Sequence, residues 1–276
     1  MEALVYPQNF AAVRSASGNR VDLEYDLDRD RWPWLSLEPR HPVLIEKYQY
    51  FGAVTAVLAQ QLVDTSTFTA LTQFEWACVG RGDRHATCGV YVDSSSPGAP
   101  RFELTLVGPD GVVLAKTEGS GFAFTDRDVG AWRSASRTKA LAASVPGIDA
   151  FAAASEAGLP PDGASFLAPP ETVDGKTSCR GVVQTNRAFH PAHPFHTGSG
   201  DHVNAGHLFD CALQFAHLLG RATQPCTGGR AQFFRFVELD VPFEIVSLDA
   251  TRTDANAASA LFRQLDRDSA KIELQF

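Results

Sequence analysis

A duplicated order of predicted elements, repeated after about 160 residues, constrains the fold of this chain more than any other feature. In the first copy, residues 20–25 alternate polar and apolar side chains like a half-buried strand. A long helix is predicted at about residues 45–63, because apolar side chains recur there at helical spacing without an internal proline. Several strands are predicted after this helix. The pattern predicts an α+β unit in which an antiparallel sheet wraps one long helix.

The second copy repeats the order of the first. In the first copy the later strands are predicted at residues 68–79, 86–92, 101–107 and 112–124, and the turn Gly108-Pro109-Asp110-Gly111 joins the last two. In the second copy we predict a strand at residues 181–189, a helix at 203–219, strands at 231–239, 241–248 and 271–276, and a polar excursion at 249–268.

These elements divide the chain into two units and a connection. We expect an N-terminal unit at residues 1–125, a linker with some helix at 126–175, and a C-terminal unit at 176–276 that carries most of the site. Two such units side by side would join their sheets and cover the edge strands that each would otherwise expose. Two unrelated α+β domains are the alternative.

Composition excludes several classes of partner. The formal net charge is −8 and no run of Lys or Arg could follow a phosphate backbone, so nucleic acid is not expected as a partner. The first residues lack a signal-peptide pattern, and no apolar run approaches the ~20 residues of a membrane span. We therefore expect a cytoplasmic protein without a membrane partner.

The five cysteines are scattered without CxxC spacing, which indicates reduced thiols rather than disulfides or a zinc site.

Histidines gather in one short stretch of the second copy. Six of the eight lie between residues 190 and 217, namely His190, His193, His196, His202, His207 and His217. Imidazole is a common metal ligand, but no HExxH or facial-triad spacing is present and three of the six lie in a Pro/Gly loop. The spacing therefore predicts no metal. No GxGxxG or Walker sequence is present either, and no cofactor is expected.

The predicted helix at 203–219 has a polar face and a distinctive start. His207, Asp210, Gln214 and His217 share that face, which is either solvated, the reading we favour for His217, or buried with a carboxylate at Asp210 that needs a partner. At the start of the helix, His202 is a candidate base and Asn204 a candidate oxyanion donor beside free first-turn N–H groups. Alternatively, Asp201 caps the helix and Asn204 satisfies a loop carbonyl.

A substrate pocket is also predicted, partly from the first copy. Aromatic side chains beside charged ones near the start of the first helix could line a pocket for an acyl chain, although ordinary core packing would use them equally well. The candidate substrate-binding residues are Trp32, Trp34, Tyr48, His190, His196, Thr197, Ser199, Gly206 and Gln214.

Three segments of the second copy carry a family resemblance. Residues 201–205 (DHVNA), 234–242 (FRFVELDVP) and 271–274 (KIEL) resemble thioesterase-like hotdog enzymes of isonitrile lipopeptide and β-amino-acid polyketide biosynthesis. Those enzymes are (2E)-enoyl-[acyl-carrier-protein] glycyltransferases. They add the amine of glycine to the β-carbon of an enoyl thioester and release an N-carboxymethyl-3-amino acid. The resemblance covers mainly residues 180–276.

The chain also looks like the double-hotdog dehydratase domains of polyketide synthases. Residues 210–214 match their D-x-x-x-Q pattern, but the first-half pattern HxxxGxxxxP is missing: His85 has Gly89 four residues on, and no proline follows at the required spacing. Because β-hydroxyacyl dehydration needs that histidine with the aspartate, the absence argues against this reaction.

The resemblance implies a double hotdog, in which each unit has a long central helix wrapped by an antiparallel sheet. It implies aza-Michael addition of glycine to an enoyl thioester on an acyl carrier protein or CoA, with release from the thioester. In this reaction His202 is the candidate base, Asn204 the oxyanion donor and Asp210 an orienting or proton-transferring group. A homodimer is possible. The alternatives are an acyl thioesterase, a hydroxyacyl dehydratase and a non-enzymatic acyl-binding regulatory protein.

Overall fold

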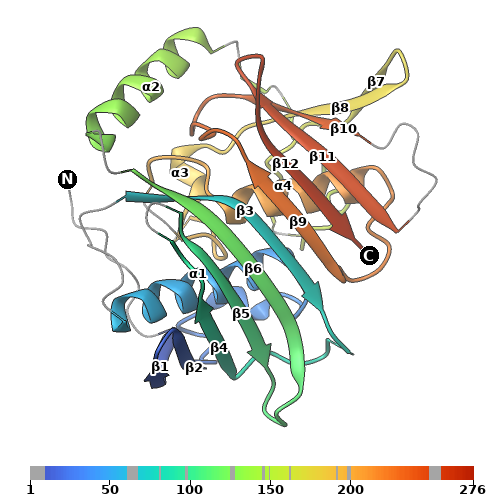
Figure 1. Ribbon diagram of the computed structural model, residues 1–276. Helices are drawn as coiled ribbons and strands as arrows, with labels where there is room; N and C mark the ends of the chain where they lie inside the picture. Colours follow the sequence, from blue (N-terminus) through green and yellow to red (C-terminus); the bar gives the residue numbers. More distant parts are fainter. Residues whose placement is uncertain are drawn as a thin grey trace. The chain divides into compact units, whose positions relative to one another are not determined.

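The computed structural model describes residues 10–276 except 61–67, 81, 97–98, 125–127, 145–146, 149, 162, 191, 198–199 and 249–255. The chain consists of two compact units, Met1–Val129 and Gly130–Phe276 (Figure 1). Each unit contains an antiparallel sheet and one helix that packs against the sheet.

The sheet of the first unit has the order β1-β2-β4-β5-β6-β3, and every pair of neighbours is antiparallel. Its strands are β1 (Ala11–Ser17), β2 (Arg20–Tyr25), β3 (Phe68–Cys78), β4 (Cys88–Asp93), β5 (Arg101–Val107) and β6 (Val113–Phe124). Strands β4, β5 and β6 form a meander. Strand β3 pairs with β6 at one edge of this meander, and β2 pairs with β4 at the other edge.

Helix α1 (Pro42–Ala59) packs against strands β1, β2, β4 and β5, after the short 3₁₀ helix η1 (Pro33–Ser36). Pro42 opens the helix, and the His41 ring accepts a hydrogen bond from Val43 N. The helix lies close to the sheet at Gly52, where a Cβ atom would come within 2.9 Å of the Tyr25 hydroxyl oxygen. A glycine is needed there because a larger side chain would separate helix and sheet.

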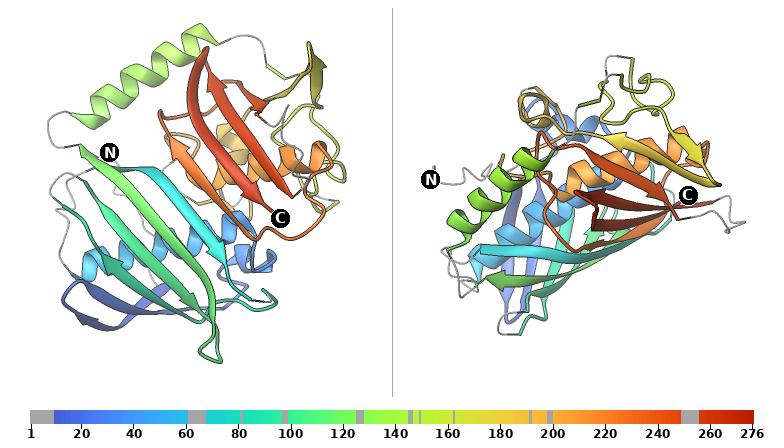
Figure 2. Two further views of the ribbon diagram at one scale, coloured as in Figure 1. Left: turned by 45° about the vertical axis from the view of Figure 1, so that its right-hand side comes forward. Right: turned by 90° about the horizontal axis from the view of Figure 1, so that it is seen from above.

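The second unit repeats this plan with the strand order β9-β12-β11-β10-β8-β7, again antiparallel throughout (Figure 2). The strands are β7 (Glu171–Val173), β8 (Lys176–Gly181), β9 (Gly228–Phe233), β10 (Phe243–Ser247), β11 (Ala257–Gln264) and β12 (Arg267–Gln275). The helices are α2 (Val129–Ala143), α3 (Thr185–Ala188) and α4 (Ala205–Leu218). Helix α4 packs against β11 and β12.

Helix α4 has well-defined ends. Asn204 is its N-cap and forms a capping box with His207, and Gly220, with φ of +68°, follows the C-cap Leu219. Most of the helix is buried, including Leu208, Phe209, Ala212 and Phe215. Its polar residues Asp210 and Gln214 are buried as well, so the predicted polar face does not lie in solvent there.

Several predicted elements are confirmed. Strands at 20–25 and 101–107 have the predicted bounds, and the helices predicted at about 45–63 and 203–219 are present as α1 and α4, although residues 61–63 lie outside the described residues. The Gly108–Gly111 turn is also present, with Gly111 at φ +76° and its N–H bonded to Gly108 O.

Other predictions are wrong. The strand predicted at 181–189 is not formed, because β8 ends at Gly181 and the chain then turns into α3. Asp240 supports this turn, since its carboxylate accepts hydrogen bonds from the Thr185 N–H and hydroxyl. The described part of the predicted excursion at 249–268 contains strand β11, while residues 249–255 lie outside the described residues, and β1 was not predicted at all.

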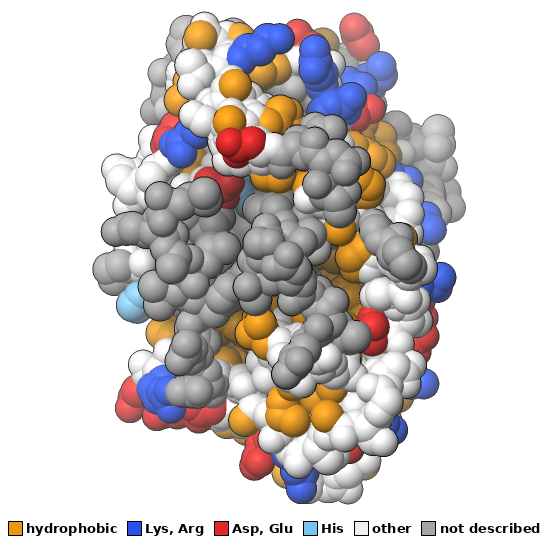
Figure 3. All heavy atoms as spheres, turned by 60° about the vertical axis from the view of Figure 1, so that its left-hand side comes forward, with side chains coloured by type: hydrophobic (Ala, Val, Ile, Leu, Met, Phe, Trp, Pro, Cys, Tyr) orange, Lys and Arg blue, Asp and Glu red, His pale blue; other side chains and the backbone are white. Residues whose placement is uncertain are grey.

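No helix in the described part of the chain is long and apolar enough to cross a membrane. On the face drawn in Figure 3, Lys and Arg side chains lie beside Asp and Glu side chains.

Candidate functional site

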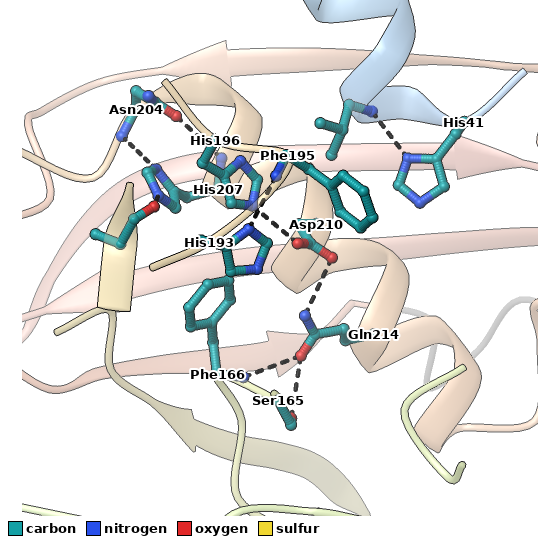
Figure 4. A network of polar contacts seen from close by, with 12 residues as sticks. His41, Ser165, Phe166, His193, Phe195, His196, Asn204, His207, Asp210 and Gln214 are labelled. Carbon is teal, nitrogen blue, oxygen red and sulfur yellow. Dashed lines mark hydrogen bonds and ion pairs between the residues drawn. The ribbon is translucent and has the colours of Figure 1, made fainter. Parts of the chain in front are cut away.

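Two clusters of polar side chains lie in the second unit, one around each of two histidine–aspartate pairs. The first, here called the buried cluster, consists of His193, His196, Asp210 and Gln214 (Figure 4). His196 Nε2 lies 2.9 Å from Asp210 Oδ2, and Gln214 Nε2 donates to Asp210 Oδ1 at 3.0 Å. The side chains of His196 and Asp210 are 0% and 6% exposed. Both carboxylate oxygens of Asp210 are thus bonded inside the protein.

Gln214 connects the buried cluster to a neighbouring loop. Its Oε1 accepts hydrogen bonds from Ser165 Oγ at 3.0 Å and from Phe166 N at 3.1 Å. Two donors to one oxygen fix the orientation of the amide, so the nitrogen must face Asp210. Gln214, predicted as a substrate-binding residue, lies in the core and holds Asp210 in place.

His193 completes the buried cluster from the loop before α4. Its ring centroid lies 4.4 Å from that of His196, and its Nδ1 accepts a hydrogen bond from Phe195 N at 3.3 Å. One ligand-type atom from each of His193, His196 and Asp210 lies within 4.8 Å of the other two. The spacing along the chain predicted no metal, yet the fold brings three metal-ligand side chains together.

His207 has a structural role beside this cluster. Its Nε2 donates to Ala188 O at 2.7 Å, and its Nδ1 accepts from Asn204 N at 3.3 Å. One nitrogen that donates and one that accepts are the pattern of a neutral imidazole. The ring is fully buried, so this residue of the predicted polar face connects α4 to the end of α3.

The second cluster, here called the entrance cluster, lies just before α4 and around Phe236. Asp201 Oδ1 lies 2.5 Å from His202 Nδ1, and the His202 ring lies edge-on to Phe236 with centroids 4.8 Å apart. The side chains of His202 and Asp201 are 20% and 40% exposed. This pair is therefore open to solvent.

Arg133 of helix α2 holds the entrance cluster in place through an ion pair with Glu238, here called the brace. Its two terminal nitrogens lie 2.6 and 2.8 Å from the carboxylate oxygens of Glu238 in a bidentate pair. The same guanidinium donates to Asp201 O at 3.3 Å, lies 3.6 Å from Asp201 Oδ2 through its Nε, and covers the Phe236 ring at 4.3 Å. The side chains of Arg133 and Glu238 are 7% and 4% exposed. The backbone and carboxylate of Asp201 are thereby held toward a fixed cation.

Asn204 caps α4, a contact that the oxyanion prediction did not include. Its Oδ1 accepts from His207 N at 3.1 Å and its Nδ2 donates to Thr197 O at 2.8 Å. Both ends of the amide are engaged, so Asn204 shapes the helix start and ties the loop at Thr197 to it. Gly206 is buried in the first turn of the same helix.

The predicted acyl pocket of the first unit is filled by aromatic packing. Trp32, Trp34 and Tyr48 are 6%, 2% and 1% exposed, and all three rings contact Phe10. Tyr48 borders a cavity of about 10 Å³, which is too small for an acyl chain. Burial raises the pKa of Tyr48 above its ordinary value. These side chains form a core, as the alternative reading expected.

The other predicted residues are spread along the loop and helix. His190 is exposed and its N–H bonds to His196 O at 2.9 Å, which closes the loop that carries His193. Ser199 lies outside the described residues. His217 is half-buried, and burial lowers its pKa. Its ring packs so closely on Gly158 that a Cβ there would come within 2.3 Å.

Sequence reasoning missed three residues that complete the two clusters. Arg133 and Glu238 lie 105 positions apart, and Ser165 lies 49 positions from Gln214. Arg133 fell in the predicted linker and Glu238 in a predicted strand. In the structure Glu238 follows β9, which ends at Phe233, and a buried arginine in a helix and a buried glutamate in a loop have no local pattern that would pair them.

Comparisons with known proteins show similarity at the level of structure. No family model and no curated protein matches the chain. An acyl-ACP thioesterase from Bacteroides thetaiotaomicron is similar over 85% of this chain and 89% of its own, with 6% identity and a TM-score of 0.55. The 12:0-ACP thioesterase from Umbellularia californica is similar over 95% of this chain and 98% of its own, with 8% identity and a TM-score of 0.51.

These likenesses show a fold and no more, because the identities are low. The chain has the hotdog-type fold of thioesterases, with antiparallel sheets and few helices, as the resemblance implied.

Proposed function

We propose that this chain is an enzyme that acts on acyl thioesters of a carrier protein or CoA, with His202 as its general base. The observation that carries the proposal is the solvent-accessible pair of Asp201 and His202 directly before α4. The hotdog-type fold supports the thioester as the substrate class, since both structures compared above are thioesterases of acyl carrier protein.

The Asp201–His202 pair sets the tautomer of the imidazole. A carboxylate 2.5 Å from Nδ1 holds the proton on that nitrogen, so Nε2 carries the lone pair. When Nε2 takes a proton, the adjacent carboxylate stabilises the imidazolium that forms. Asp201 is thus a positioning residue and His202 the group that moves the proton.

The start of α4 supplies the second requirement, stabilisation of negative charge on the thioester oxygen. Ala205 and Gly206 are the first two residues of the helix, and their N–H groups have no partner within a helix. The helix dipole adds to their positive potential. We assign the oxyanion role to these backbone groups, and to Asn204 the role of capping the helix beside them.

The finer proposal concerns the nucleophile, which is the amine of glycine. His202 removes a proton from the glycine ammonium, the nitrogen forms a bond to the β-carbon of an enoyl thioester, and the electron pair of the double bond moves to the thioester oxygen. The imidazolium returns a proton to the α-carbon, which restores the carbonyl. The sequence resemblance over residues 180–276 supports this reaction.

Hydrolysis is the second candidate, and it is the reaction named for the two thioesterases compared above. In this reaction His202 removes a proton from water, the oxygen attacks the thioester carbonyl carbon, and the thiol leaves with a proton. The same backbone N–H groups stabilise the tetrahedral oxyanion.

The test is product analysis by mass spectrometry with an enoyl thioester and its saturated analogue, each with and without labelled glycine. Addition predicts label in the product from the enoyl substrate alone. Hydrolysis of both substrates without incorporation of label replaces glycine with water as the nucleophile. Binding of both thioesters without any turnover, in the wild-type protein, refutes the enzyme proposal in favour of an acyl-binding regulatory protein.

A further inference from the structure

We infer that the buried cluster is a binding site for one divalent transition-metal ion of the zinc class. The ligands are His193, His196 and Asp210, whose ligand atoms lie within 4.8 Å of one another. This inference rests on the geometry of that cluster and not on the function proposed above.

The distances suit an ion of this size. Metal bonds to histidine nitrogen and carboxylate oxygen are about 2.0–2.2 Å long, which places two neighbouring ligand atoms about 3 Å apart. His196 Nε2 and Asp210 Oδ2 are already 2.9 Å apart. His193 lies on a loop and is only half-buried, so its ring can close onto an ion that the other two hold.

The ligand chemistry selects the kind of ion. Two imidazoles and one carboxylate suit Zn²⁺ or Fe²⁺, whereas Mg²⁺ and Ca²⁺ prefer oxygen ligands alone. His193 Nδ1 carries a lone pair, because it accepts the N–H of Phe195 over a long 3.3 Å contact that a metal bond would replace. At His196 the ion displaces the proton shared with Asp210, and that proton leaves to solvent.

The hydrogen bonds around Asp210 resemble those that orient a metal-binding carboxylate. Its second oxygen, Oδ1, accepts from Gln214 at 3.0 Å, and Gln214 is itself fixed by Ser165 and Phe166. Such outer hydrogen bonds orient ligating carboxylates in metal sites. A carboxylate with negligible solvent contact also benefits from a nearby cation, which an ion would supply.

The test is the metal content of the full chain. After treatment with a chelator and gel filtration, the protein is mixed separately with Zn²⁺, Fe²⁺, Co²⁺ or Mg²⁺, freed of unbound ion, and measured by mass spectrometry of the elements. We expect about one Zn²⁺ per chain, a visible Co²⁺ spectrum typical of nitrogen and oxygen ligands, and no retained Mg²⁺.

The variants separate this site from others. His193→Gln and Asp210→Asn should each weaken Zn²⁺ binding by about 10-fold or more, whereas His217→Gln keeps it. His202→Ala should also keep the ion, so loss of activity in that variant does not bear on the metal. If Asp210→Asn fails to fold by circular dichroism, His193→Gln decides, because its side chain is half-buried. Wild-type protein that retains none of the transition metals, or a His193→Gln variant that retains zinc with wild-type affinity, overturns the inference.

Discussion

The second unit holds two histidine–aspartate pairs that differ in their access to solvent. In the pair His196–Asp210 the side chains are 0% and 6% exposed, and in the pair His202–Asp201 they are 20% and 40% exposed. The contacts also differ in the histidine atom: His196 uses Nε2, 2.9 Å from Asp210 Oδ2, and His202 uses Nδ1, 2.5 Å from Asp201 Oδ1. A buried pair cannot exchange protons with a substrate unless the core opens, whereas an accessible pair can. This difference supports the proposed proton transfer at His202 and the proposed metal binding at His196.

The two pairs also differ in what holds the aspartate. Asp210 is held by the neutral amide of Gln214, and Asp201 by the guanidinium of Arg133. Gln214 brings no positive charge to the buried carboxylate, which favours a cation nearby. A charged partner anchors the exposed carboxylate while its histidine remains open to solvent.

The largest effect is expected at the brace of the accessible pair. Arg133→Met removes one member of the bidentate pair with Glu238 and leaves a buried carboxylate without its counter-charge. This should lower the free energy of unfolding by about 3–5 kcal/mol, measured by urea denaturation. The double variant Arg133→Met/Glu238→Leu should recover most of that loss. A single variant as stable as the wild type would show that the accessible pair does not depend on this brace.

The next effect concerns catalysis and divides the two pairs directly. His202→Ala should lower turnover of an acyl thioester by about 10²-fold, the usual range for loss of a positioned base. Turnover is measured with the substrates of the product analysis, and the fold is checked by circular dichroism. His217→Ala is the control and should be nearly neutral in turnover. Full activity of the His202→Ala variant would show that another residue is the general base. The two pairs would then not differ in this role.

A smaller effect is expected at Gln214, which holds Asp210 of the buried pair in place. Gln214→Leu leaves Asp210 Oδ1, Ser165 Oγ and Phe166 N without their present partner. The free energy of unfolding should fall by about 1–3 kcal/mol, the cost of unsatisfied buried polar groups. Gln232→Leu, at an exposed position on β9, is the matched control and should change stability by less than about 0.5 kcal/mol. Equal effects of the two changes would argue against a built support.

The smallest effect is a dependence of stability on pH at the other end of α4. Burial lowers the pKa of His217, so the folded state favours the neutral ring. The stability that this residue permits is complete above the unfolded pKa of about 6.5 and is lost as the pH falls through that value toward the folded pKa. His217→Gln should flatten the decline of thermal stability between pH 7 and pH 5. An unchanged decline would assign it to other groups, including the two pairs.

The sequence predicted both long helices because their apolar periodicity is local, and α4 was found within two residues at each end. Strand β11 was missed because its residues, AASALFRQ, include small side chains with low strand propensity. The strand predicted at 181–189 failed for a different reason. The carboxylate of Asp240, far along the chain, bonds the Thr185 N–H and turns the backbone into α3.

The candidate site was predicted in part. His196, His202, Asp210 and Gln214 were identified because they gather near one helix, but their pairing was not. The partner of Asp210 lies in a loop whose path the sequence does not specify, and the N-cap of α4 is Asn204, whereas the alternative interpretation of the sequence gave that role to Asp201. The brace came from Arg133, in a segment that the composition predicted to be a linker. Contacts between residues so far apart in the sequence depend on the tertiary structure and leave no local sequence pattern.

The position of Arg133 determines where the second unit can be separated from the rest of the chain. Helix α2 supplies both Arg133 and Ser136 to the carboxylate of Glu238, and Glu238 is almost fully buried. A fragment expressed from residue 150 onward would retain all the strands of the second unit and lose the cation that Glu238 needs. A fragment that begins before Val129 keeps α2. We expect this fragment, and not the one that begins at residue 150, to fold with the pair of Asp201 and His202 intact.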